Sequence, residues 1–327
     1  MDIDNETQRT GTCAMQGTDN TAGIASSRVA LALALVYLVW GSTYLAIRFA
    51  LEGGFPPFLL GGIRFTIAGV LMFAVLRWRG FPVPTRAQWG NAAVVGVLLL
   101  LLGNGMVNLA EKTVPSGIAA VAVASAPLWM GVFSAMRGER PSRLEWVGLG
   151  IGFLGVLWLN SGSSLTSAPW GLVALLVASV SWAFGSIWSR GRDLPSPFMG
   201  AAAQMICGGL VMCVVGVLLG ERIHSMPTSA GLAAFAYLIV FGSLIGFTAY
   251  IWLLHHVRPA LASSYAYVNP AIAVALGAWL AGERFGMHEL VAMGVILLGV
   301  VAITLAKSFR HKPRPPTPPL STAKVPT

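Results

Sequence analysis

Residues 145–156 read EWVGLGIGFLGV and residues 289–300 read ELVAMGVILLGV, so the chain carries nearly the same stretch twice, at an offset of 144 residues. Gly-Glu-Arg at 138–140 recurs at 282–284 with the same offset. Trp40 and Arg48 recur as Trp182 and Arg190, 142 residues later. The drift of two residues indicates one duplicated unit with small changes in loop length. A period near half of an apolar chain is typical of a two-fold membrane repeat, whereas solenoids repeat every 20 to 50 residues.

The composition indicates a protein whose solvent is largely lipid. Hydrophobic residues make up 56% of the 327 residues, charged residues 10%, and the mean hydropathy is +0.73. A soluble domain carries roughly 25% charged residues. The net charge of +9 lies in short basic clusters between apolar runs, which is typical of cytoplasmic loops rather than of a nucleic-acid interface. We therefore expect the bilayer and a small-molecule solute as partners, no nucleic acid, and no cofactor; a homodimer is compatible with the sequence.

Apolar runs of membrane-spanning length predict an all-α protein with ten transmembrane helices. The predicted spans are 29–50, 58–76, 89–110, 115–136, 144–160, 169–188, 197–219, 230–254, 259–281 and 287–306. The predicted organisation is a disordered cytoplasmic tail (1–28), a first repeat (29–160), an external linker (161–168), a second repeat (169–306) and a Pro-rich cytoplasmic tail (307–327). The first 27 residues lack the apolar core of a signal peptide, so the first span should remain as an anchor.

Basic residues predict the orientation. With both termini in the cytoplasm, the inside segments hold 14 Lys and Arg residues near the membrane and the outside loops hold 3, as the positive-inside rule requires. Each repeat has five spans, and five is odd, so the second repeat enters the membrane in the opposite orientation. Inverted repeats are the usual basis of alternating access, with the substrate site near the midplane between the halves. We therefore predict a secondary transporter.

Several motifs also carry a family resemblance. Val39 to Tyr44 (VWGSTY), Asn269-Pro270, and Gly282-Glu283 resemble the EamA-type branch of the drug/metabolite transporter (DMT) superfamily. Residues 103–111 (GNGMVNLAE) and 114–120 (VPSGIAA) are similar to its amino-acid and metabolite exporters. The resemblance implies two EamA-like units, about 31–160 and 170–306, in an inner-membrane exporter of small solutes. It does not name the solute.

Polar side chains recur at helical spacing inside four of the predicted spans. Polar groups in hydrocarbon need partners or a wet cavity. We therefore predict that four stripes line one central substrate-binding cavity, with helix–helix hydrogen bonding as the alternative reading. The residues predicted to bind substrate are Trp40, Tyr44, Arg64, Asn104, Asn108, Trp182, Tyr265 and Asn269.

Arg64 is the most specific candidate for a substrate-binding residue, because it is a charged residue six positions inside the second predicted span. It should either reach the outer interface with its long side chain or bind a carboxylate, of Glu52, of Glu111 or of the solute. Pro127 and Pro270 lie in mid-span at equivalent places of the repeats, where a kinked helix suits a gate.

Acidic residues lie only near the ends of the predicted spans. Glu111 is the one that continues an intramembrane polar face, so it is the best candidate for proton coupling. The sequence nevertheless favours transport without proton coupling, because an interfacial carboxylate is poorly placed to face each side in turn.

Other mechanisms find less support in the sequence. There is no Gly-x-x-x-x-Gly-Lys loop for direct ATP use and no Gly-x-Ser-x-Gly elbow of a rhomboid-like protease. His288-Glu289 begins a zincin motif, but Ala292 stands where its second His belongs. We therefore expect no enzymatic activity. A facilitator or channel that never alternates remains the main alternative.

Overall fold

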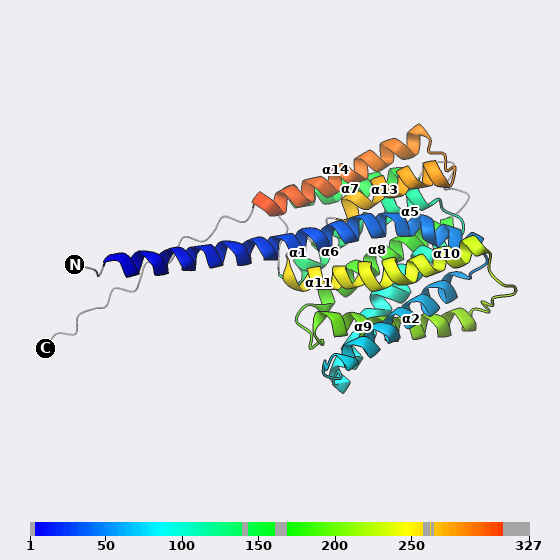
Figure 1. Cartoon of the computed structure of the whole chain (residues 1–327). Coiled ribbons are helices and arrows are strands. Elements are labelled where there is room, and N and C mark those ends of the chain that lie inside the picture. The colour runs from blue at the N-terminus through cyan, green and yellow to red at the C-terminus, as the bar shows by residue number, and fades with distance from the viewer. Residues whose placement is uncertain (1–3, 139–142, 161–168, 258–261, 263–264, 310–327) are drawn as a thin grey trace.

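The computed structural model describes residues 4–138, 143–160, 169–257, 262 and 265–309, and every regular element in these ranges is a helix (Figure 1). The first repeat contains α1 (Asp4–Glu52), α2 (Pro57–Trp78), α3 (Arg86–Gly96), η1 (Val97–Gly105), α4 (Met106–Ala110), α5 (Ser116–Val123), α6 (Ala126–Met136) and α7 (Arg143–Asn160). The second contains α8 (Pro169–Ser189), α9 (Pro197–Leu218), α10 (Ser229–Tyr237), η2 (Leu238–Phe247), α11 (Thr248–His256), α13 (Tyr265–Leu280) and α14 (Met287–Phe309).

Seven helical stretches among the described residues are long and apolar enough to cross a membrane. They are Ser27–Glu52, Pro57–Trp78, Arg86–Ala110, Ser116–Met136, Pro169–Ser189, Pro197–Leu218 and Ser229–His256. α7, α13 and α14 occupy the three remaining predicted positions, but they do not meet the same criterion over the described residues. The all-helical prediction is therefore confirmed, and the count of ten spans stays a prediction.

The predicted boundaries of the terminal segments stay predictions as well. α1 begins at Asp4 and so continues through the segment expected to be a disordered tail, although only Ser27 onward is apolar enough to cross a membrane. The predicted linker at 161–168 and the tail beyond Phe309 lie outside the described residues. The start of α1 and the end of α14 point to the same side of the bundle (Figure 1).

Equivalent helices of the two repeats pack against each other. α2 lies along α9, and α7 lies along α14, so the second and fifth predicted spans each meet their counterpart. Glycines permit the close approach of α2 and α9: a Cβ on Gly62 would lie 2.5 Å from Cys213 Sγ, and one on Gly209 would lie 2.6 Å from Thr66 Oγ1. Small residues at helix interfaces bring backbones together in membranes, where packing rather than hydrophobicity drives association.

The third and eighth predicted spans both contain a long π-helical segment. η1 covers residues 97–105 and η2 covers residues 238–247, at nearly the offset of the sequence repeat. π-Helical turns are rare and are frequently found at functional sites, because they widen the helix and redirect side chains. Both segments supply residues to the central cavity described below.

The two equivalent prolines have different effects on the backbone. Pro127 stands at the start of α6, after a break at Ala124 and Ser125 that separates α5 from α6. Pro270 lies inside α13, which continues through it. The fourth predicted span is therefore interrupted at its proline, whereas α13 accommodates the missing hydrogen-bond donor without a break.

Candidate functional site

A small cavity lies at the centre of the bundle, where both repeats contribute walls. Its volume is about 60 Å³. It is lined by Trp40, Thr43, Tyr44, Ile47, Arg64, Phe65, Gly103, Asn104, Val107, Val123, Ala178, Trp182, Gly242, Phe247, Tyr265 and Asn269. This space holds a few waters, whereas small-molecule sites usually measure about 300–1,000 Å³. The cavity in this structure is therefore smaller than a typical small-molecule site.

Seven of the eight residues predicted to bind substrate line this cavity. They are Trp40, Tyr44, Arg64, Asn104, Trp182, Tyr265 and Asn269. Asn108 is not among the lining residues; it is fully buried, and its side-chain nitrogen donates to the carbonyl of Pro57 at 3.0 Å. Asn108 thus links α4 to the start of α2. This is the hydrogen bond between helices that was the alternative to lining the cavity.

Four aromatic rings from four helices form one wall of the cavity region. Trp40 of α1 lies 5.5 Å from Trp182 of α8, 5.0 Å from Tyr250 of α11 and 4.9 Å from Tyr265 of α13, measured between ring centroids. The Trp40 contacts with Trp182 and Tyr265 are edge-to-face, an arrangement that the ring quadrupoles favour. This aromatic wall presents apolar ring surface to whatever enters the cavity.

Hydrogen bonds fix the orientation of these rings. Trp182 Nε1 donates to the Tyr250 hydroxyl at 3.1 Å, and that hydroxyl also lies 3.0 Å from Ser186 Oγ. Trp40 Nε1 donates to the Gly242 carbonyl in η2 at 3.3 Å. A Cβ on Gly246 would lie only 2.5 Å from Trp40 Nε1, so this glycine leaves room for the indole.

Among the described residues, Arg64 is the only charged one that lines the cavity. Only 2% of it is exposed, and its Nη2 donates to Asn104 Oδ1 of η1 at 2.6 Å. Its Nε and Nη1 are buried without a hydrogen-bond partner among the described residues, and no ion pair joins it to Glu52 or Glu111 there. A buried guanidinium with unsatisfied donors is costly, and its contact with the Phe65 ring, 4.3 Å from the ring centroid, compensates only part of this cost.

Asn269 lines the cavity and also holds two helices together. With its amide oriented so that the nitrogen donates, it bonds the carbonyl of Tyr37 in α1 and that of Tyr265, each at 3.1 Å. It is 2% exposed. Asn269 therefore fixes α13 against α1 beside the aromatic wall.

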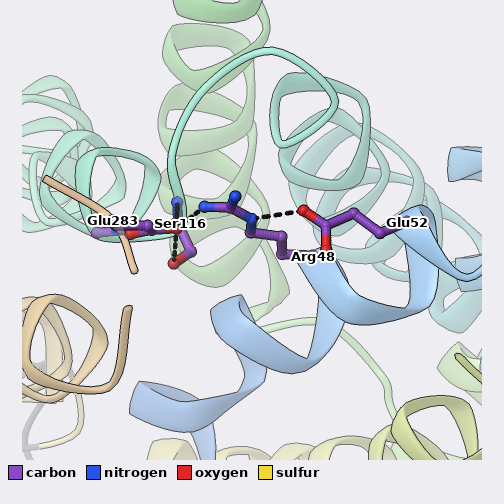
Figure 2. Close-up of polar contacts among 5 residues, drawn as sticks. Arg48, Glu52, Ser116 and Glu283 are labelled. Atoms are coloured by element: carbon purple, nitrogen blue, oxygen red, sulfur yellow. Dashed lines mark hydrogen bonds and ion pairs between the residues drawn. The ribbon is translucent and has the colours of Figure 1, made fainter. Parts of the chain in front are cut away.

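A charged network joins the end of α1, the start of α5 and the α13–α14 connection (Figure 2). We call it the Arg48 network: Arg48, Glu52, Ser116, Gly117 and Glu283. Arg48 Nε donates to Glu52 at 2.8 Å on its own helix, and Arg48 Nη1 donates to Glu283 in the α13–α14 connection. Glu283 also accepts from Ser116 N at 3.0 Å, from Ser116 Oγ at 2.7 Å and from Gly117 N at 3.3 Å.

The Arg48 network joins three segments from both repeats. Glu283 accepts the first backbone N–H groups of α5, where the helix dipole favours a negative charge. Burial alone raises the pKa of Glu283, but the hydrogen bonds from Ser116 and Arg48 outweigh it and hold the pKa below its ordinary value. The carboxylate is therefore ionised, and it fixes α1 and α5 to the α13–α14 connection.

A second carboxylate caps a helix at the same end. Glu221, which follows α9, accepts from Phe58 N at 3.2 Å and from Leu59 N at 2.9 Å, at the start of α2. Beside it opens a vestibule of about 650 Å³ that Arg48, Glu111 and Glu221 help to line. Tyr44 lines the cavity and Arg48 the vestibule, so a single turn of α1, about 6 Å, separates the two spaces.

The sequence did not identify Tyr250 or Glu283 as parts of these sites. Tyr250 is fully buried and connects two of the cavity tryptophans, but it stands alone in an apolar run without a helical stripe. Glu283 belongs to the repeated Gly-Glu-Arg motif, which was the available signal. Its partner Arg48 is 235 residues away in the chain, so only the fold brings them together.

Comparisons with known proteins agree with this architecture. The model of the EamA-like transporter family matches residues 27–161 and 169–305, one copy in each half. The inner membrane transporter YedA of Escherichia coli K12 is 46% identical over 284 residues, covering 86% of this chain and 92% of its own length. The transporter YvbV of Bacillus subtilis is 24% identical, with 86% and 92% covered.

More distant matches also cover most of the chain. Protein PecM of Dickeya dadantii is 26% identical and covers 84% of this chain and 91% of its own length. One crystal structure superposes with a TM-score of 0.63 at 23% identity, covering 86% of this chain and 97% of that one. With two family copies spanning both halves, this chain belongs to the EamA-like transporter family.

Proposed function

We propose that this protein is a secondary transporter that exports small solutes bearing a carboxylate, such as amino acids or related metabolites, by alternating access. The observation that carries the proposal is Arg64. Its buried guanidinium has two nitrogens without partners among the described residues, next to an aromatic wall. A planar guanidinium matches a carboxylate bidentately, and the rings of Trp40 and Trp182 suit an apolar body.

Alternation is supported by the pairing of equivalent helices. α2 with α9 and α7 with α14 are the contacts expected of two related five-helix units. We propose ten spans as two inverted repeats, with both termini in the cytoplasm of the bacterial inner membrane. The start of α1 and the end of α14 point to the same side, which supports an even number of crossings (Figure 1). In this orientation the Arg48 network closes the outer end.

The proline sites suit a gating role in this scheme. The break between α5 and α6 at Pro127 lies directly beyond Val123, which lines the cavity. α5 begins at Ser116, in the Arg48 network, so a hinge at Pro127 allows α5 to move while α6 stays in place. Pro270 is proposed as the equivalent bend in α13.

The proposed topology is tested by alkaline phosphatase fusions. A fusion after Ser164, between the halves, should be active because that loop is expected outside. A fusion after Leu320 should be silent because the tail is expected in the cytoplasm. The reverse pattern would overturn the orientation and, with it, the outer position of the Arg48 network.

Transport itself is tested by counterflow. Overproduction in a host should first identify which amino acids or analogues the cells tolerate at toxic concentration. The purified chain is then reconstituted, the vesicles are loaded with that solute, and uptake of labelled solute is followed. A carrier gives saturable, transient accumulation above equilibrium. A facilitator that never alternates gives equilibration without overshoot, and that result would replace the proposal with the channel alternative.

A further inference from the structure

Glu111 is a buried acidic residue that makes no hydrogen bond through its side chain in the described part of the chain. It follows α4, and its backbone N–H still donates to the Val107 carbonyl at 3.0 Å. Only 6% of the residue is exposed, and both carboxyl oxygens are buried without a partner among the described residues. It lies on the wall of the vestibule, seven residues after Asn104, which lines the cavity.

The surroundings of Glu111 disfavour its ionised form. A helix C-terminus carries partial negative charge, and burial penalises an unpaired carboxylate. Burial raises the pKa of Glu111 well above its ordinary value, the charge of Glu283 raises it further, and Arg48 and Arg64 only partly oppose this. Burial without a hydrogen-bond donor among the described residues and this balance of charges both favour the protonated form of the carboxyl over the ionised one.

The charged and titratable groups near Glu111 come from several segments. α1 supplies Tyr44, Arg48 and Glu52, α2 supplies Arg64, and the α13–α14 connection supplies Glu283. The vestibule adds Lys112, Glu221, Arg222 and His224. In the closed form, Arg48 is compensated by Glu52 and Glu283, so it leaves little positive charge to stabilise an ionised Glu111.

We propose that Glu111 is a proton-binding site that is occupied while the Arg48 network is closed and is emptied when Glu283 leaves Arg48. Opening the outer end removes one negative charge from the group and frees one cation. Glu111 then ionises, and its proton passes to the water of the outer vestibule. The O–H bond of Glu111 breaks, and the electron pair stays on the carboxylate beside Arg48 and Arg64.

The proposed proton site also predicts whether the proton and the solute move in the same direction or in opposite directions. This step rests on the proposed role of Arg64. A solute carboxylate on Arg64 removes the second cation near Glu111, so it favours the protonated form. Once ionised, Glu111 competes with the solute for Arg64. Proton and carboxylate therefore bind together and leave together, which makes the transport a cotransport rather than an exchange. Export then proceeds when the outward solute gradient exceeds the inward proton gradient. Burial of Glu111 thus reverses the preference for uncoupled transport that its position in the sequence suggested.

The proton site is tested without any solute, with the proton as the probe. The full-length chain is reconstituted in phosphatidylethanolamine–phosphatidylglycerol vesicles, and the infrared carbonyl band of protonated carboxyl groups is followed with pH. Wild type minus Glu111→Gln should show a protonated carboxyl at pH 7. Glu283→Gln should lower the midpoint of this band by roughly one pH unit, because a nearby negative charge is removed.

Glu52→Gln is the matched control, since Glu52 also pairs with Arg48 but its side chain is 57% exposed. It should shift the midpoint much less than Glu283→Gln. A difference spectrum without a protonated carboxyl at pH 7 would overturn the proton site. A midpoint that Glu283→Gln leaves unchanged would overturn its link to the Arg48 network. Glu111→Asp keeps a carboxyl at the position and should keep a titrating band, which guards against loss through misfolding.

The coupling step has its own readout. A gradient of the carboxylate identified by counterflow should drive proton movement in the same direction, and Glu111→Gln should abolish this proton movement while solute counterflow persists. Protons moving opposite to the solute, or not at all, would overturn the cotransport. Loss of counterflow in wild type would instead count against the transport proposal alone.

Discussion

Arg48 is partly buried and Arg64 is fully buried, and the two side chains have different kinds of hydrogen-bond partner. Arg48 meets two carboxylates, and one of these, Glu283, accepts hydrogen bonds from three further N–H or O–H donors. Arg64 donates to one neutral amide, lies over the Phe65 ring, and leaves two nitrogens without a hydrogen-bond partner among the described residues. An arginine whose N–H donors bond carboxylates of the protein holds segments in place. An arginine with unpaired N–H donors is available to a ligand. In the proposed function, this difference assigns closure of the path to Arg48 and binding of the solute to Arg64.

The largest effect should come from the cavity arginine. Arg64→Ala should reduce transport about 100-fold at normal protein levels, because removing one partner of a buried charge pair costs ~2–5 kcal/mol. Arg79→Ala, at an exposed position after α2, is the matched control and should transport normally. Counterflow at equal amounts of reconstituted protein measures both. Normal flux in Arg64→Ala would remove the ligand role and erase the distinction between the two arginines.

The next effect concerns opening of the network rather than solute binding. Glu283→Gln should speed labelling of Val123→Cys in the cavity by an impermeant maleimide added outside intact cells. The native cysteines are first replaced by Ala. The rate should rise about tenfold, since a charge-assisted hydrogen bond contributes ~1.5–3 kcal/mol. Unchanged labelling would show that the network does not control access from this end.

A smaller effect should follow from crowding the aromatic wall. In Gly246→Ala the new Cβ would lie 2.5 Å from Trp40 Nε1, so the indole must move and its bond to Gly242 is strained. Losing that bond costs about 1 kcal/mol, which predicts roughly a fivefold fall in flux. Gly131→Ala in α6 is the control, because a Cβ there meets nothing within 4 Å. Equal flux in both variants would show that the orientation of Trp40 does not matter.

The smallest effect is the pH dependence of closure. The pKa of Glu283 is lowered in the folded protein, so its stabilising bonds are present above the ordinary carboxyl range and are lost only as pH falls through the lowered value. In a Glu111→Gln background, which removes the proposed proton site, the ratio of Val123→Cys labelling between chains with Glu283→Gln and chains with native Glu283 should stay constant from pH 8 to 6. It should approach one only below roughly pH 4. A ratio that falls between pH 8 and 6 would show that another group controls closure.

Much of the central cavity could be predicted from the sequence, because helical spacing places polar residues of one span on one face. Trp40, Tyr44 and Asn104 reach the cavity for this reason. The pairing of Arg48 with Glu283 could not be predicted, since it depends on how the halves pack. Asn108 shares its predicted stripe with Asn104, yet its side chain bonds Pro57, because η1 ends between them and the π-helical geometry rotates the following residues.

The equivalent prolines show another limit of the sequence. Pro127 and Pro270 lie in matching positions, but only the fourth predicted span is broken there. Whether a helix breaks at proline depends on which neighbours satisfy the freed carbonyl, and this is a property of packing. The repeat therefore predicted the two positions where a helix could bend, but it did not predict that the helix breaks at Pro127 and continues through Pro270.

Counterflow of a carboxylate compared with its carboxamide tests the central claim most directly. In wild type the carboxylate identified by the tolerance screen should drive counterflow, and its uncharged amide should drive it at least tenfold less. Arg64→Lys keeps the charge but loses the planar fork, so it should weaken carboxylate transport and narrow this preference. Equal transport of acid and amide by wild type, with the same ratio in Arg64→Lys, would contradict a cavity in which Arg64 binds the solute carboxylate.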